Sequence, residues 1–150
     1  MIFQSAYFTR TTLKKMLNEL TLAQLTFIPK GFKNHILWNI AHILVTEQLL
    51  SYKLSNLKMN MDENYVALYG KGSIPKQSYT QNEINAIKTD LIPLIKQTEK
   101  DYKNGIFKTF NTYPTSVGIT LKNIDDALQF NSFHEGIHVG IILSIKKMVG

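Results

Sequence analysis

The sequence contains no cysteine. Disulfide bonds, thiolate metal sites and a cysteine nucleophile are therefore excluded, and this composition is compatible with a reducing compartment. The sequence also lacks a long hydrophobic run. Its longest apolar stretch, residues 137–143, is interrupted by a histidine and is far shorter than the ~20 residues of a membrane span. The first residues have neither the basic region nor the apolar stretch of a signal peptide. These absences predict a cytoplasmic protein with no membrane partner.

Arginine is almost absent: of the 17 basic residues, Arg10 is the only arginine. The formal net charge is +6, but the lysines are spread over the whole chain and form no dense cluster. Proteins that bind nucleic acids favour arginine for clamping phosphates and gather their basic residues on one face. The sequence therefore predicts a solvated, lysine-rich surface and no nucleic-acid partner.

What is present is the composition of a globular protein, with 44% hydrophobic and 19% charged residues over 150 positions. A chain of this length buries a full core without disulfides or structural metals. We expect one domain that spans residues 1–150.

Apolar residues recur with helical periodicity in four segments. In the first of them Leu13, Met16, Leu17 and Leu20 follow the spacing of one buried stripe. The expected helices span residues 5–25, 34–56, 80–103 and 123–148. With two long connections between them, they predict an all-α four-helix bundle whose topology is not simply up-down-up-down.

Residues that start or disturb helices mark several of these boundaries. Asn34 is the expected N-cap of the second helix, and either Asn123 or Asp125 is expected to cap the fourth. Thr80 begins a Thr-x-x-Glu capping box at the start of the third helix. Pro93 falls inside that helix and is expected to kink or interrupt it.

Two connections are unusually long. Residues 57–79 form a stretch of more than twenty residues with glycine and proline, and residues 107–122 form the second. Loops of this length inside a domain are often functional lids or binding loops. A short strand or a 3₁₀ turn is expected within the first.

The four histidines carry the strongest chemical signal. His134 and His138 are four residues apart on an expected helix, so both imidazoles lie on one face and can reach one ion. His42 lies in the middle of another expected helix, among aliphatic residues. Burying imidazoles without a shared partner is costly, which favours a three-histidine metal site over a set of ordinary core histidines.

The segment from His134 to His138 also matches the H-E-x-x-H pattern of zinc metalloproteases, in which the glutamate is the general base. That class needs a third ligand, usually downstream, and the twelve residues after His138 contain no histidine, aspartate or glutamate. Glu135 is also turned about 100° away from His134 around the helix. A peptidase is therefore not expected.

Two segments resemble the DinB/YfiT-like family of metal-dependent enzymes. They are NHILWNIAHILVTEQ at residues 34–48 and FHEGIHVGIIL at residues 133–143. The resemblance implies a bundle of DinB/YfiT type with the metal site between its second and fourth helices, and a homodimer. It also implies a divalent ion, zinc or nickel, held by His42, His134 and His138. His35 matches no ligand of the family.

The resemblance implies a small-molecule substrate and, for some relatives, transfer of a low-molecular-weight thiol. Three histidines leave coordination positions open, and no cysteine is present, so a thiol nucleophile would arrive as a cosubstrate. The first hypothesis is therefore a metal-dependent thiol transferase that acts on small electrophiles. A metal-dependent hydrolase assisted by Glu47 or Glu135 and a non-enzymatic metal- or ligand-binding stress-response module are the alternatives. Asn131 and Trp38 share faces with the histidines. Plain packing or capping is the favoured interpretation of both, and orienting the ligands or walling the pocket is the alternative.

Overall fold

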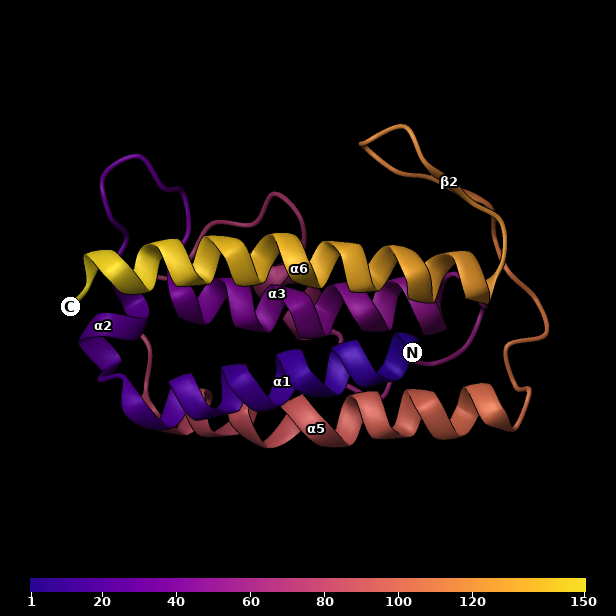
Figure 1. Cartoon of the computed structure of the whole chain (residues 1–150), viewed down its shortest axis with the longest axis horizontal. Coiled ribbons are helices and arrows are strands. Elements are labelled where there is room, and N and C mark those ends of the chain that lie inside the picture. Colours follow the sequence, from indigo (N-terminus) through magenta and orange to yellow (C-terminus); the bar gives the residue numbers. More distant parts are fainter.

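The computed structural model describes all 150 residues and contains four long helices. They are α1 (Ile2–Glu19), α3 (Ile36–Gln48), α5 (Gln81–Lys103) and α6 (Ile124–Met148). Helix α3 packs against α6 and α5, and α1 packs against α5 and α6. Figure 1 shows that α3 and α5 run in the same direction, whereas α1 and α6 run in the opposite one. The expected all-α bundle without simple up-down-up-down topology is confirmed.

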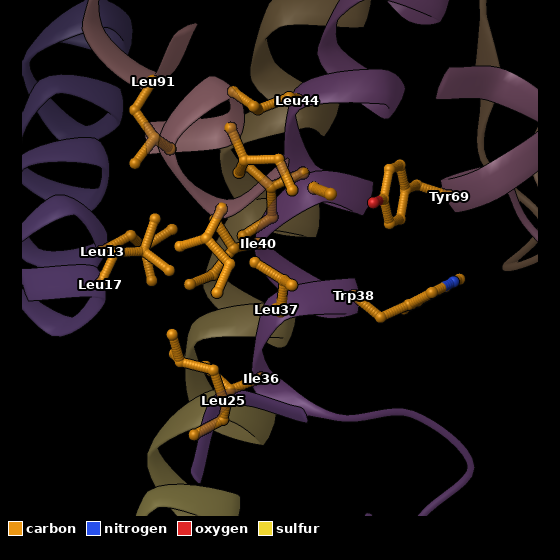
Figure 2. Close-up of a cluster of buried hydrophobic side chains, with 14 of the residues drawn as sticks. Leu13, Leu17, Leu25, Ile36, Leu37, Trp38, Ile40, Leu44, Tyr69 and Leu91 are labelled. Atoms are coloured by element: carbon orange, nitrogen blue, oxygen red, sulfur yellow. The ribbon is translucent and has the colours of Figure 1, made fainter. Parts of the chain in front are cut away.

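Helix α3 is the most buried of the four, because all but one of its 13 residues are inaccessible to solvent. Figure 2 shows that Leu37 and Ile40 point towards Leu13 of α1, whereas Trp38 and Tyr69 lie on the other side of the helix. Each fully buried aliphatic side chain contributes about 1.5–3 kcal/mol to stability. One face of α3 therefore holds the bundle together, which leaves the other face available for polar groups.

The prediction of a single helix over residues 5–25 is wrong, because the structure divides this segment into two helices. Helix α1 ends at Glu19, and Leu20 adopts an extended conformation. Thr21 then caps the short helix α2 (Leu22–Thr26) through a capping box with Gln24. The capping box gives hydrogen-bond partners to two backbone N–H groups that would otherwise have none. A new helix can therefore start favourably at Thr21.

The second expected helix forms, but its cap differs. The N-cap is His35 rather than Asn34, because the Nδ1 atom of His35 accepts a hydrogen bond of 2.9 Å from the backbone N–H of Trp38. At its other end α3 continues into a π-helical turn, η1 (Leu49–Lys53). Such turns interrupt α-helices most often at functional sites.

The caps of the last two helices are confirmed. Thr80 and Glu83 form the expected capping box at the start of α5, and the Asn123 side chain accepts a hydrogen bond from the backbone N–H of Asp126 at the start of α6. The interruption expected at Pro93 is wrong, since α5 is continuous through that residue.

Both long connections contain secondary structure. Residues 57–79 include an α-helix, α4 (Asn64–Tyr69), in place of the expected strand or 3₁₀ turn. The second connection contains a small antiparallel hairpin of β1 (Tyr113–Pro114) and β2 (Thr120–Leu121), which was not predicted. The hairpin stands beside the N-terminal half of α6 (Figure 1). None of the helices has the length and apolar character that crossing a membrane requires.

Candidate metal centre

His42 of α3 and His134 and His138 of α6 converge at the contact between the two helices. One ring nitrogen of each lies within 4.8 Å of the corresponding nitrogens of the other two. The Nε2 atoms of His42 and His134 are 3.2 Å apart. The spacing of the two histidines on α6 and the central position of the third on α3 thus bring together the three side chains that the sequence singled out.

Hydrogen bonds fix the orientation of two of the rings. The Nδ1 atom of His42 lies 2.7 Å from the carbonyl oxygen of Tyr69, and Nδ1 of His138 lies 2.8 Å from Oδ1 of Asn39. The Asn39 amide is itself oriented, because its Nδ2 donates to the His35 carbonyl over 2.9 Å. Both oxygens can only accept, so each Nδ1 carries the proton and each Nε2 presents a lone pair.

This donor set fits a divalent ion. Two nitrogens bound at 2.0–2.1 Å to a tetrahedral ion lie about 3.3 Å apart, close to the observed separation of the Nε2 atoms. The hydrogen bonds from Nδ1 are the outer contacts that usually hold metal-binding imidazoles in place. The ring of His134 lacks such an outer contact, since its Nδ1 atom is buried and has no hydrogen-bond partner. The three histidines could therefore hold a metal ion, and imidazole ligands suit zinc and nickel.

Burial keeps the imidazoles neutral, which is the form that binds metals. Removal from water lowers the pKa of His134 to about 3, assisted by the neighbouring charges of His138 and His42. Burial likewise lowers the pKa of His138 to about 4, with His42 adding to the effect. The pKa of His42 is lowered by burial, against the opposing hydrogen bond to Tyr69.

We expect the metal-free protein to lose stability as the pH falls from about 6.5 towards 4. In this window histidines of the unfolded chain are protonated, whereas His134 and His138 of the folded chain stay neutral. The unfolded state therefore binds more protons, and the free energy of unfolding decreases with acidification. Urea unfolding across this range measures the effect. The variant His134→Ala should show a shallower pH dependence, and an unchanged slope would contradict the assignment.

The outer wall of the centre is aromatic. The indole of Trp38 stacks on the imidazole of His42, with ring centroids 4.7 Å apart and an interplanar angle of 11°. Its Nε1 donates to Oγ of Ser73 over 3.0 Å, and this hydroxyl donates in turn to the Leu68 carbonyl. The loop after α4 is thereby attached to α3, and Trp38 is part of the wall of the site, the alternative considered for it.

The centre opens into a cavity of about 480 Å³, a volume typical of small-molecule sites. Its walls come from α3, η1 and α6, from the loop after α4 and from the hairpin. The lining residues are Asn34, Trp38, His42, Thr46, Leu49, Leu50, Lys53, Leu54, Lys71, Gly72, Tyr113, Thr115, Ser116, Phe130, His134 and His138. The hairpin, absent from the sequence predictions, thus contributes to the candidate site.

The supporting roles considered for Asn131, Glu135 and Glu47 have no counterpart in their contacts. Asn131 donates to Glu135, and Glu135 pairs with Arg10 at 2.6 Å. Glu47 is buried and accepts a hydrogen bond from Thr98 over 2.7 Å. None of the three hydrogen-bonds to a ligand histidine. These carboxylates belong to a separate buried polar cluster that includes Arg10 and Thr98.

Sequence reasoning missed Asn39 and the Tyr69 carbonyl. Asn39 could have been found, since it is a polar residue in a strongly apolar helix, four residues after His35 and three before His42. Tyr69 acts through its backbone oxygen, which any residue would supply. Its role therefore leaves no signal in the sequence.

The comparison with known proteins agrees with this geometry. No curated protein matches the chain. The model of the DinB superfamily matches residues 6–142, which include all three histidines and most of the chain. The resemblance of the two histidine-bearing segments is thus confirmed: the chain belongs to the DinB superfamily.

Proposed function

We propose that the protein is a metal-dependent enzyme that attaches a low-molecular-weight thiol to a small electrophile. The observation that carries the proposal is the convergence of three neutral nitrogen donors at the wall of a cavity of about 480 Å³. A structural metal site closes around its ion, whereas a catalytic one keeps positions open towards the substrate. Zinc or nickel is the expected ion.

The protein's own residues would hold and orient the reactants. His42, His134 and His138 would bind the ion, with Asn39 and the Tyr69 carbonyl fixing two of the rings. Trp38 shields His42 on one face. When bound, the ion supplies positive charge that favours the thiolate form of a thiol over the thiol itself. In the reaction the sulfur forms a bond to an electrophilic carbon, and the leaving group departs with the electron pair and takes up the thiol proton.

A hydrolase receives no support from a contact in the site. The two glutamates considered as bases form hydrogen bonds or ion pairs elsewhere, Glu135 with Arg10 and Glu47 with Thr98 and Gln48. No carboxylate lines the cavity. Thiol transfer needs no protein carboxylate at the site, which agrees with this lining.

Thiol consumption tests the proposal. The zinc- or nickel-loaded protein is incubated with an aryl halide or an epoxide and a panel of small cellular thiols, and conjugate formation is measured. We expect turnover above the uncatalysed rate with at least one thiol, and its loss in His134→Ala. If neither the zinc nor the nickel form produces conjugate above the uncatalysed rate with any thiol of the panel, the proposal is wrong.

Two other outcomes identify the alternatives. Turnover of ester or amide substrates without thiol would identify a hydrolase, and binding without turnover would identify a sensing module. The expected homodimer and the cytoplasmic location stay predictions, for which sedimentation and cell fractionation are the measurements.

A further inference from the structure

We propose that the cavity binds a substrate carrying a carboxylate or phosphate group, which the positive charge of Lys53 and Lys71 attracts. This inference rests on the proposed function, because it assigns the substrate class of the same site. It concerns the lysines of the cavity wall and not the histidines.

The charge of the lining supports it. The charged residues of the cavity wall are Lys53 and Lys71, and no aspartate or glutamate lines it. Neither lysine forms a salt bridge or a side-chain hydrogen bond within the protein. Two unpaired ammonium groups at one cavity raise its potential and attract anions. A cationic substrate would be repelled.

The structure sets Lys71 close to the metal centre. It follows Tyr69, whose carbonyl accepts the hydrogen bond from His42, by two residues. The next residue, Gly72, has a φ of +84°, a conformation that favours glycine. Ser73 then attaches the loop to Trp38. Lys71 therefore lies in a turn fixed at both ends to the walls of the centre.

Lys53 is the last residue of η1 and follows His42 by eleven residues along the chain. Leu49, Leu50 and Phe130 line the same cavity as the two lysines. The hydroxyl-bearing residues Thr115 and Ser116 of the hairpin line the same cavity. These walls suit a substrate that has both an apolar part and an anionic group.

Binding of small probes tests the inference without requiring turnover. The zinc-loaded full chain is titrated with hexanoate, hexyl phosphate and the uncharged 1-hexanol, and dissociation constants are measured by calorimetry or NMR. We expect an anionic probe to bind at least several-fold more tightly than the alcohol. The stronger of the two anionic probes identifies the preferred oxyanion.

Probe binding by lysine variants is the decisive measurement. In the double variant Lys53→Met/Lys71→Met the anionic probe should bind about tenfold more weakly, as expected for loss of charged hydrogen-bond partners. The binding of 1-hexanol should not change. Lys58→Met, an exposed lysine outside the cavity, is the matched control and should behave as the wild type.

Two results would overturn the inference: equal binding of hexanoate, hexyl phosphate and 1-hexanol, or anion binding that the double variant leaves intact. The second result would indicate that the probe binds the ion directly. Repeating the titration with the metal-free protein verifies this. None of these binding measurements depends on thiol transfer. The lysines can therefore be shown to bind anions even if the protein transfers no thiol, and thiol transfer can be shown even if they do not.

Discussion

The variant Arg10→Met is expected to lower the free energy of unfolding by about 3–5 kcal/mol. The guanidinium of Arg10 is completely buried, and it bonds to Oε1 of Glu135 at 2.6 Å through Nη2 and at 3.3 Å through Nε. Methionine fills a similar space but leaves the Glu135 carboxylate buried without a counter-charge. An uncompensated buried charge costs more than the pair itself contributes.

Glu47 adds to the cost. It is also fully buried. Burial raises the pKa of Glu47, and the charge of Arg10 opposes that rise. Without Arg10 the pKa of Glu47 should rise further, so the variant core must hold two carboxyl groups with no cation. All four long helices contribute to this cluster through Arg10, Glu47, Thr98 and Glu135.

Urea unfolding of the wild type and the variant gives the change in free energy from the shift of the midpoint. Lys14→Met on the exposed side of the same helix is the control and should change stability little. The double variant Arg10→Met/Glu135→Gln no longer carries the unpaired Glu135 carboxylate. Part of the lost free energy of unfolding should therefore be recovered. A loss below about 1 kcal/mol in the single variant would contradict the assigned role of the pair.

The second large effect concerns the ion. The variant His134→Ala is expected to reduce metal affinity by at least about 100-fold, since it removes one of three donors. Metal content after purification without a histidine tag and competition with a coloured chelator measure the loss. His42→Ala and His138→Ala should behave alike.

His35→Asn is the matched control. Asparagine also caps helices well, so it should preserve the start of α3 and the carbonyl that orients Asn39. We expect this variant to keep the ion. Equal metal loss from His35→Asn and His42→Ala would show that the wrong histidine has been assigned to the site.

The helical circular-dichroism signal should survive in both the chelated protein and His134→Ala. The main hydrophobic cluster contains 20 buried residues and none of the ligands, so it does not need the ion. The melting temperature should fall only by the stabilisation that a bound ligand confers. Collapse of the helical signal on chelation would make the ion structural and remove the main support for an enzyme.

Much of the fold follows from local signals. The apolar stripes of the long helices and the capping residues Thr80 and Asn123 act within a few residues of sequence, so they could be recognised without the structure. The break after Glu19 was missed because the apolar periodicity continues through Leu20, although Thr21 and Gln24 carried the capping signal. The two-residue strands of the hairpin are too short for any alternating pattern.

The centre was predictable in its ligands and much less so in their surroundings. His134 and His138 are one helical turn apart, so their proximity is local. Arg10 and Glu135 are separated by 125 positions, and only the packing of α1 on α6 brings them together. That Glu135 lies outside the centre, by contrast, followed from its angular offset of about 100° from His134 around the helix.

Trp38 is the only tryptophan of the chain, and its indole is stacked on a candidate ligand. When the protein is excited at a wavelength that its seven tyrosines do not absorb, the fluorescence therefore arises entirely beside the centre. Nickel has a partly filled d shell and quenches a neighbouring indole, whereas zinc, with its filled shell, has no such excited-state pathway. The brightness of the emitted light can thus distinguish the two ions and follow their exchange in real time.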